Sequence, residues 1–357
     1  MKDRKRDGIC KRICALASAA VLALSLSACG NSSGDGTQAK EWLWVPEFIT
    51  VDEENVSYYD MQLVGDALYY TSYDWDEATE TSSQSICKYS LADKSVTSVP
   101  ITLSEESENW NLNRCAYTED GSMYSVVNVY NEDYSQSRSY LCKFGADGKQ
   151  IFSQEMTDLV GDSYVDMIAL DGQGRIYVSC ESSILLFDAE GNNKGKVSLE
   201  SGNGWINAMG CGKDGRMYVC YYNNDGYDLA DIDFDAKKVA NTYDNFASGN
   251  SNRLTAGIEK DFLVNDGSSV YEYDLKSQKL EELFSWLDSD INGNNATCMG
   301  QLEDGRILAV INDWENNDNG IALLTKTNAS EVAPRETIVI GAMYSTSQLQ
   351  SAAVKFN

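Results

Sequence analysis

Two tryptophans with amide neighbours are the side chains in this sequence best suited to hold a ligand. Trp110 is flanked by Asn109 and Asn111, and Trp205 stands two residues before Asn207. An indole offers a flat apolar face and an amide both donates and accepts hydrogen bonds, so the combination is typical of surfaces that stack against a sugar ring. Trp110 and Trp205 are therefore candidate ligand-binding residues.

Alternating carboxylates offer a second kind of chemistry. Asp231, Asp233 and Asp235 alternate along one segment, near Asp225 and Asp228. Calcium prefers several carboxylate oxygens, but this spacing is not that of an EF-hand loop. An acidic, solvent-facing strand is the better interpretation, and no metal site is predicted.

The sequence contains no histidine. This excludes Ser-His-Asp and Cys-His catalysis, imidazole metal sites and imidazole acid–base chemistry. The lack of histidine does not exclude catalysis by carboxylates alone, as in glycoside hydrolysis. Because no pair of carboxylates stands out, we expect no enzymatic activity, no catalytic residue and no cofactor.

The charge of the chain excludes one class of partner. Its 357 residues hold 55 Asp and Glu against 28 Lys and Arg, a formal charge of −27. Residues 1–28 hold six of the basic and two of the acidic side chains, so the remaining chain carries −31. Such a surface repels phosphate backbones, and we expect no binding to nucleic acid.

The cysteines of the main part of the chain are odd in number and irregular in spacing. They are Cys87, Cys115, Cys142, Cys180, Cys211, Cys220 and Cys298. Most fall inside apolar, strand-like segments, and no pair has the C-x-x-C spacing of a zinc or redox site. This pattern predicts buried free thiols, with one or two disulfides as the alternative.

The amino-terminus has the organisation of an export signal. A basic leader precedes an apolar segment at 13–28, which is too short and too rich in Ala and Ser to span a bilayer comfortably. The end of the segment and the two residues after it read Leu26-Ser27-Ala28-Cys29-Gly30, which resembles the lipobox of bacterial lipoprotein precursors. The resemblance implies removal of residues 1–28, lipidation of Cys29 and a location at the outer face of the cell membrane. An ordinary secretory signal is the alternative.

The main part of the chain, residues 41–334, is a repeat that must position any site. A turn followed by an alternating apolar strand recurs six times, after a linker at 29–40. The steps between successive copies are 55, 53, 41, 45 and 45 residues. The apolar anchors of the copies are Leu68, Met123, Ile176, Met217, Phe262 and Ile307.

Each copy contains four short strands, with a tight turn, often Asp-Gly, between the first two. Four-stranded antiparallel units repeated radially are typical of a β-propeller. We therefore predict an all-β propeller of six blades, or of seven if Glu41–Tyr58 hides a further unit. Its aromatic residues would mainly fill the space between neighbouring sheets.

The two ends of the repeat complement each other. The sixth unit lacks its fourth strand, whereas Trp42–Val51 forms an aromatic, strand-like segment before the first unit. We predict that this segment completes the last blade and closes the ring. Trp110 and Trp205 precede the first strands of their units, so both are expected at one mouth of the propeller.

Residues 335–357 follow a different pattern. Thr337–Met343 is a continuous apolar run, typical of a strand buried in a parallel sheet. Ser345 and Gln348 match a capping box, which predicts a helix after the strand. The residues expected on one face of that helix are Leu349, Ala352, Ala353 and Phe356.

The stretch Thr337–Asn357 resembles the first strand and helix of the extracellular solute-binding proteins of ABC importers, family 1. In that family two α/β lobes close over a sugar or similar solute, and we expect the present chain to hold only the truncated start of that domain. The resemblance implies ligand contacts at Tyr344, Ser345 and Thr346, for which helix capping is the alternative.

Together these features predict a lipid-anchored, extracellular solute-binding component of an ABC importer in a Gram-positive bacterium. A carbohydrate is the expected solute, the transporter permease the expected protein partner, and the propeller a recognition or docking module. The alternative is a stand-alone surface β-propeller lipoprotein that binds a protein or glycan partner.

Overall fold

A computed structural model gives the fold. It describes residues 40–49, 51, 56–58, 60–76, 81–104, 109–161, 163–199, 205–223, 226–246, 254–313, 318–332 and 347–356. Residues Leu43–Asn357 form one compact unit, to which the description below applies.

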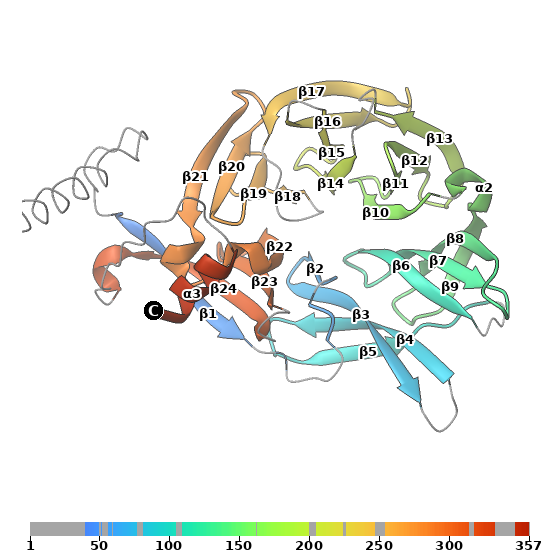
Figure 1. Ribbon diagram of the computed structural model, residues 1–357, viewed down its shortest axis with the longest axis horizontal. Coiled ribbons are helices and arrows are strands. Elements are labelled where there is room, and N and C mark those ends of the chain that lie inside the picture. Colours follow the sequence, from blue (N-terminus) through green and yellow to red (C-terminus); the bar gives the residue numbers. More distant parts are fainter. Residues whose placement is uncertain are drawn as a thin grey trace, which may run out of the picture. The chain divides into compact units, whose positions relative to one another are not determined.

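The described residues form six four-stranded sheets arranged as a ring (Figure 1). In each sheet neighbouring strands pair in the order of a meander, with the first strand of the unit at one edge. The chain is therefore an all-β propeller of six blades, as the repeat predicts. Element labels follow Figure 1.

The first three blades use consecutive strands of the chain. Blade 1 consists of β2 (Gln62–Val64), β3 (Ala67–Asp76), β4 (Thr81–Ser90) and β5 (Val96–Pro100). Blade 2 consists of β6 (Trp110–Tyr117), β7 (Met123–Tyr130), β8 (Ser137–Phe144) and β9 (Gln150–Glu155), and the short helix α2 (Thr157–Val160) follows it. Blade 3 consists of β10 (Val165–Leu170), β11 (Ile176–Cys180), β12 (Ser183–Phe187) and β13 (Asn193–Ser198).

The last three blades complete the ring. Blade 4 consists of β14 (Ile206–Cys211), β15 (Met217–Tyr222), β16 (Tyr227–Asp233) and β17 (Lys238–Phe246). Blade 5 consists of β18 (Thr255–Ala256), β19 (Phe262–Asn265), β20 (Ser269–Asp274) and β21 (Lys279–Ser285), followed by the 3-10 turns η1 (Trp286–Ser289) and η2 (Gly293–Asn295). Blade 6 consists of β22 (Ala296–Gln301), β23 (Ile307–Asp313), β24 (Asp318–Asn328) and β1 (Trp42–Ile49), with η3 (Ala329–Glu331) after β24.

The second strand of each blade begins at a recurring tight turn. In blade 4 the Asp214 carboxylate accepts a hydrogen bond from the backbone N–H of Arg216 at 3.1 Å, and Gly215 adopts a φ of 76°. Only glycine tolerates such a φ without strain, which explains the Asp-Gly pair. The apolar anchor that follows each turn is fully buried in all six blades.

The core of the propeller lies between the blades. Six hydrophobic clusters are found among the described residues, and each combines side chains of two neighbouring blades. Aromatic rings bridge these interfaces: Tyr177 meets Phe234 at a centroid distance of 5.7 Å, and Tyr218 meets Phe262 at 4.9 Å. The predicted role of the aromatic residues in packing between sheets is confirmed for these pairs.

The ring is closed by its amino-terminal strand. β1 pairs with β24 and forms the outer edge of blade 6, next to the last strand of the repeat (Figure 1). Trp44 of β1 is 5% exposed, its ring lies 5.6 Å from that of Phe284, and its carbonyl accepts a hydrogen bond from Ser289 Oγ at 2.7 Å. The predicted closure is confirmed.

The carboxyl-terminal segment contains the predicted helix, α3 (Ser347–Phe356). Its exposed and buried positions differ from the expected ones, because Ala352 is exposed and the polar Gln350 is buried. The preceding Thr337–Met343, predicted as a strand, lies outside the described residues. None of the helices in the described part of the chain has the length and hydrophobicity that a membrane crossing needs.

Candidate functional site

One end of the ring collects two kinds of connection. Because strands alternate in direction within a blade, the links between blades and the links between second and third strands emerge at the same end. We call this end the connector face. The tight turns between first and second strands emerge at the opposite end, the turn face.

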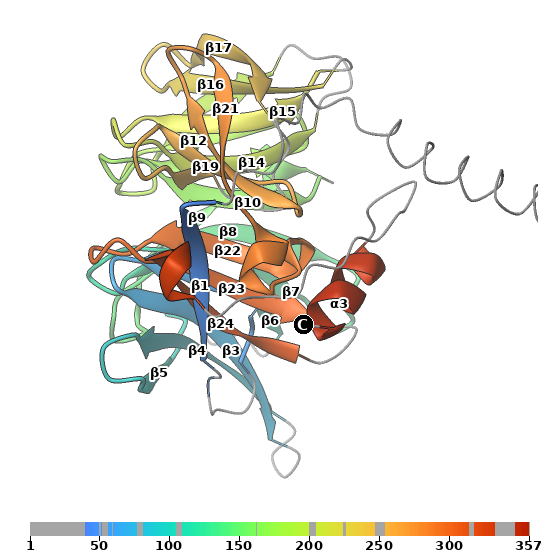
Figure 2. The ribbon, with the colours of Figure 1, turned by 90° about the vertical axis from the view of Figure 1, so that its left-hand side faces the viewer.

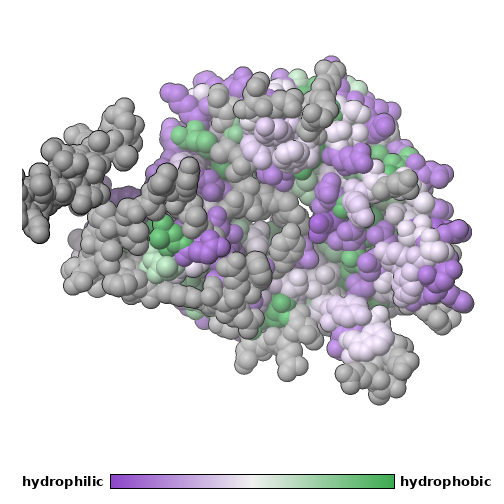
Figure 3. Space-filling model, in the orientation of Figure 1, coloured by the Kyte–Doolittle hydropathy of each residue, from purple (hydrophilic) through white to green (hydrophobic). Residues whose placement is uncertain are grey.

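Exposed aromatic side chains concentrate on the connector face. Among the described residues, the large aromatic side chains that are more than half exposed lie at strand ends or in loops of this face. They are Phe48, Tyr73, Trp75, Tyr134, Tyr164 and Trp205. The view down the short axis shows pale and green areas among the purple ones, around a hollowed centre (Figure 3). Ligands and partners usually bind where exposed aromatic residues gather.

Trp205 forms the best-defined aromatic platform of this face. Its indole stacks on the ring of Tyr222, with centroids 4.9 Å apart and planes 12° from parallel, and Tyr227 meets Tyr222 edge-on at 5.4 Å. Tyr222 covers one face of the indole, yet Trp205 remains 54% exposed. About half of the Trp205 side chain is thus held in place by Tyr222 and accessible to a ligand.

Polar groups stand beside this platform at the tip of the β15–β16 hairpin. The Asn223 amide donates to the Asp228 carboxylate, and its oxygen accepts a hydrogen bond from the Gly226 backbone N–H at 3.1 Å. The carboxylate and amide are thereby held in a defined orientation at the tip of the hairpin that carries Tyr222 and Tyr227. Carboxylate and amide oxygens can accept hydrogen bonds from ligand hydroxyl groups.

The two predicted tryptophans lie in different environments. Trp110 begins β6, is only partly exposed, and packs against the cluster between blades 1 and 2. Nearby, the Tyr134 hydroxyl donates to Asn109 Oδ1 at 3.0 Å, and its ring lies 5.7 Å from that of Tyr130. The exposed aromatic surface of this blade is therefore Tyr134, whereas in blade 4 it is Trp205 itself.

Sequence inspection missed Tyr222, Tyr227 and Tyr134 as members of these aromatic groups. A signal was present for the first two, since Tyr222 and Tyr227 flank the turn residues of a predicted hairpin. The stacking of Trp205 on Tyr222 could not be predicted, because the two residues lie far apart in the sequence. The pairing of β14 with β15 brings them together.

The helix α3 also contacts the connector face. Asn292 Nδ2 donates to Ser351 Oγ at 2.8 Å, and Asn294 Nδ2 donates to Gln350 Oε1 at 2.9 Å. Gln350 Nε2 in turn donates to Ser268 Oγ at 3.3 Å. The edge-on view shows the helix beside the ribbons of blade 6 (Figure 2). These amide contacts explain why a polar side chain is the buried one.

Several predicted residues lie outside the part of the chain that the structure describes. They are Cys29, the predicted lipidation site, and Tyr344, Ser345 and Thr346, the predicted ligand contacts. The leader at 1–28 lies outside it as well. These assignments stay predictions.

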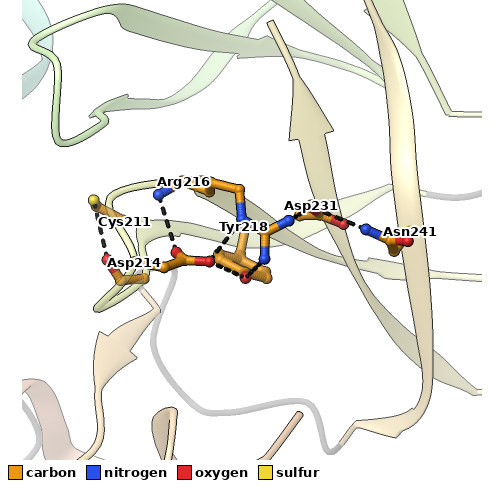
Figure 4. Close-up of polar contacts among 7 residues, drawn as sticks. Cys211, Asp214, Arg216, Tyr218, Asp231 and Asn241 are labelled. Carbon is orange, nitrogen blue, oxygen red and sulfur yellow. Dashed lines mark hydrogen bonds and ion pairs between the residues drawn. The ribbon is translucent and has the colours of Figure 1, made fainter. Parts of the chain in front are cut away.

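The interpretation of Asp231 as part of a solvent-facing acidic strand is wrong. Its side chain is fully buried and pairs with the Arg216 guanidinium, while Asn241 Nδ2 donates to the same carboxylate at 3.2 Å (Figure 4). Asp235, in contrast, is highly exposed. Alternation along the strand misled the sequence argument, because the half-exposed Arg216, in the turn before the neighbouring strand β15, pairs with the buried Asp231 carboxylate.

The same network holds the turn of blade 4 in place. Asp214 accepts hydrogen bonds from Arg216 Nε at 2.6 Å and from the Tyr218 hydroxyl at 2.9 Å (Figure 4). Partial burial raises the pKa of the Asp214 carboxyl, but the hydrogen bonds from Arg216 and Tyr218 outweigh it and lower the pKa below its usual value. Burial also raises the pKa of Tyr218, which stays protonated as a donor.

This arrangement recurs in other blades, which identifies it as structural. In blade 3 Asp171 accepts from Arg175 Nε at 2.6 Å and from the Tyr177 hydroxyl at 3.0 Å. In blade 6 Arg306 donates to Asp304 in the same way. A contact that recurs in blades 3, 4 and 6 serves to fix the turns rather than to bind a ligand.

The cysteines named by the sequence are free thiols. Cys87, Cys142, Cys180, Cys220 and Cys298 are buried, whereas Cys115 and Cys211 are half-buried. No group of three or more metal-ligating side chains is found among the described residues.

No family model matches the chain, and no curated protein matches it. Solved structures that resemble it include virginiamycin B lyase from Staphylococcus aureus, with 11% identity, a TM-score of 0.48, and coverage of 79% of this chain and 99% of that one. A gluconolactonase from Xanthomonas campestris has 9% identity and a TM-score of 0.44, covering 82% and 99%. A puromycin hydrolase has 12% identity and a TM-score of 0.44, covering 71% and 49%.

These neighbours contradict the expectation that the chain is not an enzyme. The structures named above are a lyase, a lactonase and a hydrolase. The sequence argument failed at its last step, because the lack of a conspicuous pair of carboxylates in the sequence does not exclude an enzymatic activity. At 9–12% identity the likeness concerns the fold, and it assigns no particular reaction to this chain.

Proposed function

We propose that the propeller is a carbohydrate-recognition module whose binding platform is Trp205. The half-exposed indole, held flat against Tyr222 at 4.9 Å, is the observation that carries the proposal. A pyranose ring presents a face of C–H groups that packs on an indole, while its hydroxyl groups remain at the edge for polar contacts. Asn223 and Asp228, at the tip of the same hairpin, would supply the polar groups.

The platform is organised before any ligand arrives. Tyr222 restricts the indole from below, and Tyr227 holds Tyr222 from its edge. Binding therefore costs little side-chain entropy, which is the usual advantage of rigid aromatic anchors. The further aromatic residues of the connector face, Tyr164 and Trp75 among them, would extend the contact for a longer glycan.

We place this module in a lipid-anchored, extracellular solute-binding component of an ABC importer. Two features of the sequence support this proposal. The residues up to Cys29 resemble a lipobox, and Thr337–Asn357 resembles the start of a solute-binding domain. Contacts between α3 and the link from blade 5 to blade 6 would set that domain on the same end of the ring as the glycan platform. The permease of the transporter and a small carbohydrate would then be the partners.

Binding of glycans to the full chain tests the recognition role. A glycan array identifies ligands, and isothermal titration then compares wild type with Trp205→Ala and Trp42→Ala. Both tryptophans are about half exposed, but only Trp205 belongs to the platform. We expect Trp205→Ala to weaken binding about tenfold or more and Trp42→Ala to leave it unchanged. Equal binding by wild type and Trp205→Ala would refute the platform.

Two further observations test the cellular setting. Labelling of cells with a radioactive fatty acid should mark the wild-type protein and not Cys29→Ser. The genomic reading frame beyond Asn357 should encode the two α/β lobes. A frame without these lobes, even after correction of frameshifts, would end the importer proposal while leaving glycan recognition intact.

A further inference from the structure

Two exposed aromatic residues of the connector face occupy the same structural position in neighbouring blades. Tyr164 directly precedes β10 of blade 3, and Trp205 directly precedes β14 of blade 4. Each of these strands pairs through its first residue with the second strand of its blade, and a β-bulge follows at once. Because the two strands share this register, Tyr164 and Trp205 are equivalent residues of adjacent blades.

The repeat itself does not require an aromatic residue at this position. In blade 6 the first strand has the same register and the same bulge, and the equivalent residue is Asn295. Tyr164 is 83% exposed and Trp205 is 54% exposed, so neither ring serves mainly to pack between blades. Exposed aromatic residues that the fold does not need indicate a binding surface.

The two positions lie at the inner rim of the ring. β10 and β14 are the innermost strands of their blades, and their Cα atoms approach one another to within 8 Å (Figure 1). In a ring of six blades, equivalent points of neighbouring blades are as far apart as each point is from the axis. Residues on the innermost strands are therefore the closest equivalent pair, and a short ligand can reach both aromatic rings.

The residue on the adjacent strand differs between the two positions. Next to Trp205 lies Tyr222, whose backbone N–H donates to the Trp205 carbonyl at 3.1 Å and whose ring stacks on the indole. The same register places Glu181 at the position of Tyr222 in blade 3. Its carboxylate accepts a hydrogen bond at 2.9 Å from the hydroxyl group of Ser163, the residue before Tyr164. Blade 4 thus offers two aromatic rings, and blade 3 an aromatic ring and a carboxylate.

Linked sugar rings are suited to this pair of positions. A pyranose packs its C–H face on an aromatic ring, and the hydroxyl groups at its edge donate to carboxylates. In blade 3 a second carboxylate is available, because the exposed Asp166 is the bulge residue of β10. A single sugar fills one position, whereas a chain of sugars fills both.

We propose that Trp205 and Tyr164 form two adjacent subsites, so that the connector face binds a linear oligosaccharide of at least two residues across blades 3 and 4. One sugar ring stacks on Trp205 and a following ring on Tyr164, where its hydroxyl groups donate to Glu181. The inference rests on the proposed function and extends it from one platform to a chain of sugars. Occupation of the second subsite is intramolecular once the first is filled, so affinity rises with chain length.

Isothermal titration of the full chain with glycans of different length tests the second subsite. The probes are maltotetraose, cellotetraose, mannotetraose and xylotetraose, each compared with its monosaccharide. We expect at least one tetrasaccharide to bind at least tenfold more tightly than its monosaccharide. Tyr164→Ala should remove most of this difference and leave monosaccharide binding unchanged, whereas Tyr164→Phe keeps the ring and should retain the difference. Tyr134→Ala is the matched control, since Tyr134 is 65% exposed but lies in the β7–β8 loop, and it should change neither affinity.

Four results would overturn the inference. They are a lack of binding by all four tetrasaccharides, equal affinity for each tetrasaccharide and its monosaccharide, wild-type binding of the tetrasaccharide by Tyr164→Ala, and an equal loss in Tyr134→Ala. Trp205→Ala separates this inference from the proposed function. If Trp205→Ala weakens binding and Tyr164→Ala does not, the platform stands and the second subsite is refuted. If Trp205→Ala binds like the wild type, the platform itself is refuted.

Discussion

Closure of the ring by β1 should carry a large share of the stability of the propeller, and Trp44 is the side chain that tests it. Trp44 is 5% exposed, contacts the Phe284 ring and belongs to the cluster between blades 5 and 6. Replacing a buried tryptophan by alanine costs about 3–5 kcal/mol, and the site cannot collapse easily because two sheets hold it open. We expect Trp44→Ala to lose about 4 kcal/mol.

Denaturant unfolding followed by circular dichroism measures this loss, with Trp42→Ala as the matched control. Trp42 lies on the same strand but is 46% exposed, so its replacement should cost less than about 1 kcal/mol. The melting temperature of Trp44→Ala should fall by about 10 °C. Deletion of residues 41–51 should lower it further. Equal losses in the two tryptophan variants would refute the role of β1 in closure.

Three further predictions concern single side chains. Asp231→Ala removes a buried carboxylate that pairs with the half-exposed Arg216 and should cost about 1–3 kcal/mol in denaturant unfolding, whereas Asp235→Ala, at an exposed position, should cost almost nothing. Partial burial raises the pKa of Asp188, but hydrogen bonds, first that from Lys194, outweigh it and lower the pKa to about 2. Asp188→Asn should therefore lose about 1 kcal/mol at neutral pH. Burial raises the pKa of the Cys220 thiol to about 12, so iodoacetamide at pH 8 should leave it unlabelled in the folded protein.

The outcomes that contradict these predictions are distinct. Similar losses in Asp231→Ala and Asp235→Ala would mean that the ion pair contributes nothing. Because the folded pKa of Asp188 lies below its ordinary value of 3.8, its contribution is present above that value and disappears as the pH falls toward 2. A deficit of Asp188→Asn that does not shrink over this range would contradict the assignment. Mass spectrometry that finds Cys220 alkylated before unfolding would contradict its burial.

The architecture could be predicted because the propeller repeats its local rules. Each blade starts its second strand after a tight turn, and the apolar residue that follows, such as Met217 or Ile307, is fully buried. A missing fourth strand in the last unit and an extra strand at the start implied closure by β1. These features depend on neighbours in the sequence, so one chain was enough to reveal them.

The surroundings of the candidate site residues could not be predicted, because they depend on contacts between strands that the repeat length and the composition of the sequence do not specify. Both faces of every blade are covered by neighbouring blades, so alternation along a strand says little about exposure. Trp110 and Trp205 stand in equivalent places, yet the first packs between blades and the second on Tyr222. The strand pattern predicts an exposed carboxylate at Asp231. The structure shows it buried and paired with Arg216, which lies fifteen residues earlier in the sequence.

The pairing of β1 with β24 has a mechanical consequence. Tension applied between the two ends of the ring acts on the hydrogen bonds that join these two strands, and the other five sheets lie outside the path of the force. Blade 6 would therefore open first. Stretching of a single molecule would show one early rupture, at the β1–β24 pair, before the other five blades unfold.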